Sequence, residues 1–314
     1  MKLLKSQMKK TLLIALALLI PFTVNCKSNK CQVRWGTFNI RLQNSGDEKA
    51  GYGWSVRKDR VANYVKDNNI EIVGMQEVLQ AQLEDLLARL PEYDYVGVGR
   101  TDGKTKGEYS PIFFLKDRFD VLEKGNFWLS ETPDVPGSKG WDAAIERVAS
   151  YAKLKDKRTG KVFMAVNTHF DHVGVTARRE SAKLIMKKIQ QIVGKQPAVV
   201  TGDFNVTEED EAYKTMIGEQ ATGSSEASKD GQKTKGKSSK RKVVKLSDSY
   251  YKTTNHTGVT YTWHQFCQLP PDKREKIDFI FITPTIKVKQ THIEEPAPQA
   301  LLSDHNPHWA DLEF

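Results

Sequence analysis

Short stretches of apolar residues, either continuous or alternating with polar residues, recur along most of the chain and predict β-strands. They cover residues 33–40, 70–77, 93–99, 110–115, 119–129, 147–170 (two strands joined by a turn at 156–160), 197–205, 258–266, 276–282, 286–293 and 307–314. Three longer stretches carry apolar residues at helical spacing instead, at 55–68, 79–90 and 177–193. The chain therefore holds more strands than simple strand–helix alternation supplies, which favours two packed sheets with helices outside them.

One segment departs from this pattern. Residues 219–245 are rich in Ser, Gly and Lys and contain almost no apolar residue before Val243. Such a composition cannot bury enough surface to offset the entropy of ordering it, so we expect a disordered surface insertion within one domain at 31–314. A solvated loop is the favoured interpretation, while a binding role for this basic tract towards nucleic acid, acidic glycans or anionic lipid stays open.

The N-terminal residues 1–25 have the pattern of an export signal. Four lysines precede an apolar run of about a dozen residues, whereas a membrane span needs roughly 20. Cys26 follows directly, which indicates a bacterial lipoprotein with this cysteine lipidated, although Asn25 is not the usual small residue before it. We expect an exported protein, either a cell-envelope lipoprotein or a periplasmic or extracellular one, that meets a membrane only through this anchor.

The net charge of +9 is concentrated in two segments. Residues 1–25 carry four positive charges and residues 218–245 carry a net five, so the remaining residues have no net charge. This distribution argues against a broad nucleic-acid footprint on the folded body, which we expect to be a monomer. Cys31 and Cys267 show no metal-binding spacing, and they could pair or remain free thiols.

Polar side chains recur where the predicted strands end. These residues are Asn39, Glu77, His169, Asp171, Asp203, Asn205, Asp278, Asp304 and His305. Any one of them alone could be a turn residue. Because strand ends in layered α/β folds commonly converge on one edge, the recurrence predicts a single site.

The residue types in this set suit one chemistry. Carboxylate and amide oxygens are ligands that Mg²⁺ or Mn²⁺ prefers, and imidazole moves protons near neutral pH. An acidic site that faces an anionic phosphate needs a cation between the two. The set therefore predicts metal-assisted hydrolysis of a phosphoester.

The ordered motifs "TFNI", "MQE", "NTHFDH", "GDFN", "IDFIF" and "SDHNP" resemble those of the endonuclease/exonuclease/phosphatase superfamily. The resemblance runs from about residue 33 to residue 314. It implies a four-layer α/β/β/α sandwich, with the site at one edge of its two sheets. It also implies that Glu77 is the main ligand of Mg²⁺ or Mn²⁺, with Asn39 beside it and Asp304 completing the metal shell.

The resemblance also implies roles for the remaining motif residues. Asp203 and Asn205 flank the attacking water and the scissile phosphate, and His169 donates to the phosphate. Asp278 orients His305, which handles the proton of the attacking water. Whether this pair or Asp203 is the general base stays open, as does the number of metal ions.

Two stretches, 128–154 and 167–185, resemble a bacterial secreted branch that includes sugar phosphatases. In this branch Arg147 and Arg178 are candidates to bind substrate anions, because guanidinium matches phosphate geometry, with structural ion pairing as the alternative. Asp171 and His172 are expected near the site. Trp141 and Asp142 are candidates for the pocket lining or for packing, and His308 is expected to be structural.

We expect an Mg²⁺-dependent hydrolase of small phosphate esters or sugar phosphates. Extracellular nucleic acid ranks second as a substrate, and a phospholipid headgroup, as in sphingomyelinases, ranks third. A surface lipoprotein that only binds a partner is the alternative from another class.

Overall fold

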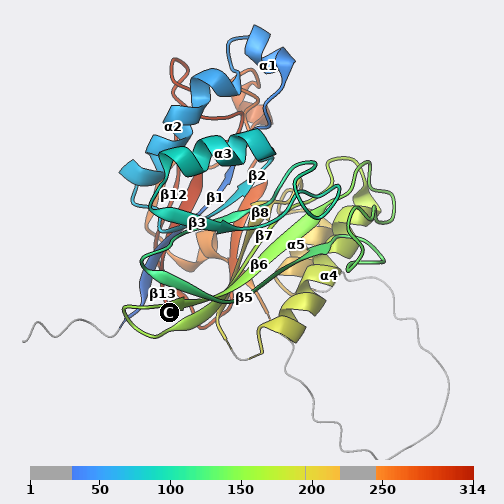
Figure 1. The fold of residues 1–314 in the computed structure, drawn as a ribbon, viewed down its shortest axis with the longest axis vertical. Coiled ribbons are helices and arrows are strands. Elements are labelled where there is room, and N and C mark those ends of the chain that lie inside the picture. Colours follow the sequence, from blue (N-terminus) through green and yellow to red (C-terminus); the bar gives the residue numbers. More distant parts are fainter. Residues whose placement is uncertain (1–29, 195, 220–244) are drawn as a thin grey trace, which may run out of the picture.

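The computed structural model describes residues 30–194, 196–219 and 245–314. The expected signal segment, Cys26 and most of the expected insertion lie outside these residues. Within them the chain forms two mixed sheets stacked face to face, with helices on their outer faces (Figure 1).

The first sheet has seven strands in the order β10-β12-β13-β1-β2-β4-β3. Their bounds are β1 Gln32–Asn39, β2 Ile72–Gln76, β3 Tyr93–Val96, β4 Ile112–Leu115, β10 His256–Gly258, β12 Lys287–Ile293 and β13 His308–Glu313. At its centre β1 runs parallel to β2 and antiparallel to β13. The carboxyl ends of β1 and β2 therefore reach the same edge of the sheet.

The second sheet has six strands in the order β5-β6-β7-β8-β11-β9. Their bounds are β5 Phe119–Trp128, β6 Val148–Asp156, β7 Val162–His169, β8 Ala198–Asp203, β9 Ser247–Asp248 and β11 Asp278–Ile282. Strands β7 and β8 are parallel, and β11 is antiparallel to β8.

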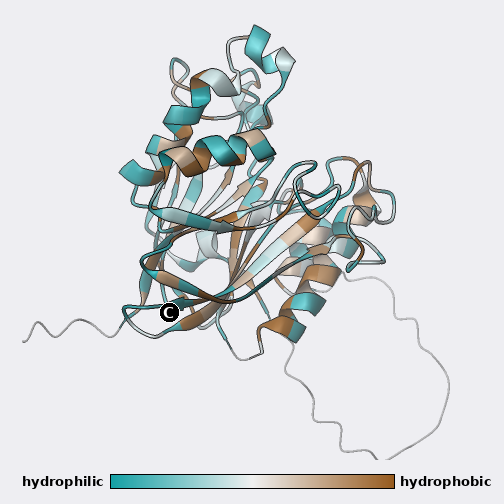
Figure 2. Ribbon diagram, viewed as in Figure 1, coloured by the Kyte–Doolittle hydropathy of each residue, from teal (hydrophilic) through white to brown (hydrophobic). Residues whose placement is uncertain are grey.

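Three apolar clusters hold the layers together. Helices α2 (Trp54–Asp67) and α3 (Gln80–Arg89) pack on the first sheet, and α4 (Val175–Ile192) and α5 (Glu211–Met216) pack on the second. Trp35 and Phe163 meet in the cluster between the sheets, with ring centroids 5.6 Å apart. In Figure 2 the hydrophobic segments lie mainly along the strands and on α4, whereas the short helix α1 (Ser45–Lys49) is hydrophilic. The predicted α/β/β/α sandwich is confirmed.

A buried arginine joins the two sheets at the end where β1 begins. Arg118 lies between β4 and β5, where the chain crosses from the first sheet to the second, and it is 6% exposed. Its guanidinium contacts Glu71 before β2, the carbonyl of Gln32 at 2.6 Å, and Asp156 at the end of β6 at 3.3 Å. Cys31 donates its thiol to Asp156 and, like Cys267, is free.

The expected strand at 258–266 was wrong. Only His256–Gly258 forms a strand, and the following residues make an irregular loop in which Trp263 bridges Glu275 and His305. Gln265, Phe266 and Cys267 adopt φ values of 50°, 54° and 62°, which no strand can accommodate. Two 3₁₀ turns, at Ser249–Lys252 and Pro271–Lys273, flank this region. No helix among the described residues is long and apolar enough to cross a membrane.

We predict that Arg118→Met lowers the free energy of unfolding by about 3 kcal/mol, because it leaves the buried carboxylate of Asp156 without its ion-pair partner. Urea unfolding measures the change. Arg158→Met is the matched control, since Arg158 lies 3.8 Å from the same Glu71 but its side chain is 65% exposed, and it should cost less than about 1 kcal/mol. Equal losses in the two variants would contradict the role assigned to Arg118.

Candidate active site

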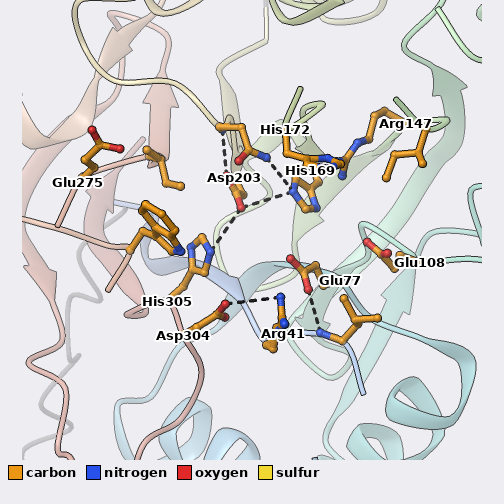
Figure 3. Close-up of a pocket in the computed structure, with 15 residues that line it drawn as sticks. Arg41, Glu77, Glu108, Arg147, His169, His172, Asp203, Glu275, Asp304 and His305 are labelled. Atoms are coloured by element: carbon orange, nitrogen blue, oxygen red, sulfur yellow. Dashed lines mark hydrogen bonds and ion pairs between the residues drawn. The ribbon is translucent and has the colours of Figure 1, made fainter. Parts of the chain in front are cut away.

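The strand register brings the predicted site residues together. On adjacent strands of the second sheet, His169 pairs with Asp203 and Asp203 pairs with Asp278, so the three lie side by side. On the first sheet Asn39 ends β1, and Glu77 follows the end of β2. These edges border a cavity of about 420 Å³ (Figure 3).

Asn39 connects the two sheets at this edge. Its Nδ2 donates to Glu77 Oε1 at 3.0 Å and to Asp203 Oδ2 at 2.9 Å, and its Oδ1 accepts from the backbone N–H of Arg41. The side chain is fully buried and does not line the cavity. The amide nitrogen thus positions two carboxylates. That Asn39 is a metal ligand stays a prediction, because its Oδ1 accepts one N–H and keeps a second lone pair.

Glu77 is held in an unusual backbone conformation. Its φ is 62°, and its Oε2 accepts from the backbone N–H of Leu42 at 2.9 Å. Arg41 and Asn205 also have positive φ values, of 58° and 50°. Such conformations cost free energy and cluster at functional sites, where surrounding contacts maintain them.

Asp278 and His305 form a buried pair. Asp278 Oδ2 lies 2.8 Å from His305 Nδ1, and because the carboxylate can only accept, Nδ1 carries a proton. Burial alone would lower the pKa of His305, but Asp278, Asp203 and Asp304 raise it to about 10. His305 Nε2 lies 3.8 Å from Asp203 Oδ2, so the three groups form a chain across the second sheet.

Asp203 is at the centre of this chain. Burial, and then the neighbouring charge of Asp278, raise the pKa of Asp203 to about 7. Its Oδ1 accepts from the backbone N–H of Asn205 at 3.0 Å, which fixes the orientation of the carboxylate. The edge thus concentrates more buried negative charge than its own cations neutralise.

His169 is a neutral imidazole in this arrangement. Asn205 Nδ2 donates to the carbonyl of Phe170 at 3.1 Å and lies 3.0 Å from His169 Nε2, so that nitrogen is an acceptor and Nδ1 carries the ring proton. Burial, followed by the charge of Arg147, holds the pKa of His169 well below its usual value. Nδ1 is buried and has no hydrogen-bond partner among the described residues.

Glu77 and Asp304 are candidate ligands for a metal ion. Both line the cavity, and burial raises the pKa of Asp304 despite His305, with Glu77 adding to the shift. Arg41 lies 3.7 Å from Asp304. These oxygens fit a hard cation such as Mg²⁺ or Mn²⁺.

A second group could also hold a metal. Ligand atoms of Asp203, Asp278 and His305 lie within 4.8 Å of one another. A metal held by Glu77 and Asp304 would instead leave the hydrogen bond between Asp278 and His305 intact.

The other predicted substrate contacts divide into two kinds. Arg147 and His172 line the cavity, whereas Asp171 and Arg178 do not. Asp171 Oδ1 accepts from the backbone N–H groups of Gly174, Val173 and Ala144, and Arg178 Nη1 donates to the carbonyl of Asp171. Their assignment as substrate-binding residues is corrected accordingly, because these contacts organise the loop behind the cavity.

Three further residues are structural. The carboxylate of Asp142 accepts from the N–H groups of Thr176 and Ala177 at the start of α4, and Trp141 does not line the cavity. Burial lowers the pKa of His308 to about 3, so this histidine is a neutral core residue.

Some lining residues were not anticipated from the sequence. They are Arg41, Leu42, Glu108, Ile145, Trp263, Glu275 and Ile277. Arg41, Ile145 and Ile277 had a usable signal, because each lies within two residues of a predicted site residue.

The fold and the site together define a class, the phosphoester hydrolases built on an α/β/β/α sandwich. The chain belongs to the Endonuclease/Exonuclease/phosphatase family, whose model matches residues 36–305. Members of this family hydrolyse phosphoester bonds and depend on a divalent metal.

Three proteins illustrate what the chain is similar to. A family structure from Bacteroides vulgatus is 51% identical with a TM-score of 0.81, and the match covers 91% of this chain and 100% of that one. The mannosyl-6-phosphatase of Bacteroides thetaiotaomicron is 36% identical with a TM-score of 0.77, over 90% of this chain and 100% of that one. An uncharacterized protein of Acanthamoeba polyphaga mimivirus is 31% identical over 168 residues, which are 49% of this chain and 60% of that relative's length.

We predict that Asp171→Asn destabilises the protein by about 2 kcal/mol at pH 7. Burial would raise the pKa of Asp171, but the N–H groups of Gly174, Ala144 and Val173, with Arg147, lower it to about 2. A lowered folded-state pKa contributes stability above the unfolded value near 4, and this contribution disappears as the pH falls through about 2.

Urea unfolding at pH 7 and pH 2 tests this dependence. The difference between wild type and Asp171→Asn should shrink at the lower pH. Asp134→Asn, at a side chain that is 84% exposed, should behave as wild type at both. A pH-independent difference would show that the charge of Asp171 is not the cause.

Proposed function

We propose that the protein is an exported, divalent-metal-dependent phosphatase of small phosphate esters, with sugar phosphates as the first candidate class. The observation that carries the proposal is the cavity in which Glu77 and Asp304 face the chain formed by Asp203, His305 and Asp278. The similarity to a mannosyl-6-phosphatase over nearly the whole of both chains supports the substrate class.

The size of the cavity and the distribution of charge favour a small ester over a polynucleotide. A cavity of about 420 Å³ is within the range of small-molecule sites. Outside residues 1–25 and 218–245 the chain carries no net charge, whereas a nuclease needs cations beside its site.

The chemical step is hydrolysis by water. The water oxygen attacks phosphorus, the bond between phosphorus and the ester oxygen breaks, and inorganic phosphate and an alcohol leave. A metal ion held by Glu77 and Asp304 would supply charge neutralisation at the phosphate and would lower the pKa of bound water. Asp203, whose pKa is raised to about 7, takes the proton that the water loses. His305, held by Asp278 and with its pKa raised to about 10, supplies the proton that the leaving alcohol oxygen gains.

We also propose export, with Cys26 lipidated, on the basis of the N-terminal pattern. Cells that express the full chain should carry it in the membrane fraction and incorporate labelled palmitate, whereas a Cys26→Ala variant should be released from membranes. A Cys26→Ala variant that stays membrane-bound would contradict the anchor.

We predict that Glu77→Gln and His305→Ala both abolish turnover but differ in metal binding. Glu77→Gln should weaken Mn²⁺ binding, measured by electron paramagnetic resonance, by at least about 10-fold, because a ligand is lost. His305→Ala should retain Mn²⁺ binding while kcat falls by about 10² to 10⁴-fold, because it removes a proton-transfer group.

The same experiment distinguishes the two candidate metal sites. Loss of Mn²⁺ binding in His305→Ala, with retention in Glu77→Gln, would move the metal to the group of Asp203, Asp278 and His305. The substrate panel covers sugar phosphates, nucleotides, DNA, RNA and sphingomyelin. Turnover of nucleic acid alone would overturn the small-ester proposal, and wild-type-like turnover in His305→Ala would overturn the mechanism.

A further inference from the structure

Arg147 is a buried cation that lines the cavity, and one of its donor atoms has no partner among the described residues. The residue is 4% exposed and lines the cavity just before β6 begins. Its Nη1 is buried and has no hydrogen-bond partner among the described residues. An unsatisfied donor on a buried charged group is costly, so its retention points to an acceptor supplied from outside the chain.

The contacts of Arg147 differ from those of the structural arginines. Arg34 and Arg100 each form two short hydrogen bonds to one carboxylate, of 2.7 to 2.8 Å, with Asp311 and Glu108. The Nε of Arg100 also has no partner among the described residues, so the difference from Arg147 lies in the short bidentate pair. Arg147 makes one long contact, from Nε to Asp171 Oδ2 at 3.5 Å. The ion pair with Asp171 therefore leaves donor atoms of the Arg147 guanidinium available for another acceptor.

Asp171 does not need Arg147 in order to be satisfied. Its two oxygens already accept from backbone N–H groups in two loops, among them those of Ala144 and Gly174. These bonds fix the carboxylate, and the carboxylate in turn fixes the direction of the arginine side chain. A guanidinium that is oriented in advance loses less entropy when it binds an anion.

His172 extends the donor set. Arg147 Nη2 lies 3.0 Å from His172 Nδ1, and because a guanidinium can only donate, Nδ1 accepts and Nε2 carries the ring proton. His172 also lines the cavity. Figure 3 shows Arg147 and His172 on one side of the cavity and Asp304 with His305 on the other.

We propose, on the basis of the phosphoesterase function above, that Arg147 and His172 clamp a terminal phosphate oxygen and thereby select phosphomonoesters over phosphodiesters. A monoester dianion has three terminal oxygens and two negative charges, so one oxygen can meet the clamp while the others face the acidic side. A diester has two terminal oxygens and one charge, and its second ester group occupies the place of the clamped oxygen. The clamp binds the group that becomes inorganic phosphate and takes no part in breaking the ester bond.

The test compares a matched pair of substrates in three variants. Arg147→Met should lower kcat/KM for p-nitrophenyl phosphate by about 100-fold, mainly through KM, because it removes hydrogen bonds to a charged group. For bis-p-nitrophenyl phosphate the loss should stay below about 5-fold. Arg147→Lys keeps the positive charge but lacks the planar set of N–H donors of a guanidinium. Its kcat/KM for p-nitrophenyl phosphate should lie between those of wild type and Arg147→Met.

Arg178→Gln is the control. It removes a guanidinium that donates to the carbonyl of Asp171 but does not line the cavity, so the monoester-to-diester ratio should not change. If Arg147→Met does not fold, His172→Gln tests the same clamp, because the side chain of His172 is 54% exposed. It should lower the ratio in the same direction by a smaller factor.

Calorimetric binding of inorganic phosphate gives a readout that is independent of turnover. Arg147→Met should weaken phosphate binding by at least about 10-fold, whereas Arg178→Gln should not. Equal losses for monoester and diester, or unchanged phosphate binding, would overturn the clamp. If the wild-type protein hydrolyses neither substrate with any divalent metal, the proposed function fails, and the phosphate measurement still decides whether the clamp exists.

Discussion

The hydrogen bonds from the amide of Asn39 hold together the site on which the rest of the chemistry depends. One nitrogen donates to a carboxylate from each sheet, Glu77 beside β2 and Asp203 at the end of β8. Two buried carboxylates would otherwise repel one another across the sheet interface. The packing of the sheets sets the distance between the two carboxylates, and the hydrogen bonds from the amide reduce their repulsion at that distance. The contacts that join the two sheets at this edge are therefore also the contacts that position the active-site carboxylates.

The sequence predicted those features that follow from strand register. His169, Asp203 and Asp278 each occupy the last or first position of an apolar strand, and hydrogen-bonded neighbours at strand ends must lie side by side. The same reasoning failed for Asp171, because the pattern of a polar residue after a strand is identical whether its carboxylate faces a cavity or accepts N–H groups from its own loop. Only the folded path of the loops distinguishes the two.

Loop conformation explains the other residues and segments that the sequence analysis did not place correctly. Residues 258–266 alternate apolar and polar side chains as a strand would, yet left-handed residues from Gln265 to Cys267 turn the chain back. This turn lets Trp263 pair with Glu275 and His305 and so reach the cavity. Glu108 likewise lines the cavity from a connection between strands. No local propensity reports such positions, since long-range contacts decide them.

Buried arginines at the two ends of the sandwich differ in how many of their donors have a hydrogen-bond partner. At the end where β1 begins, the guanidinium of Arg118 finds acceptors on every side, and this saturation stabilises the fold. Of the residues that line the cavity, His169 and Arg147 have a buried atom, Nδ1 and Nη1 respectively, that has no partner among the described residues. The contrast between Arg118 and Arg147 supports the proposal that a ligand supplies the missing partner of Arg147. Carboxylates, imidazoles and guanidinium groups line the same cavity, and a metal-bound phosphate, which carries both a cation and an anion, would satisfy both kinds of group.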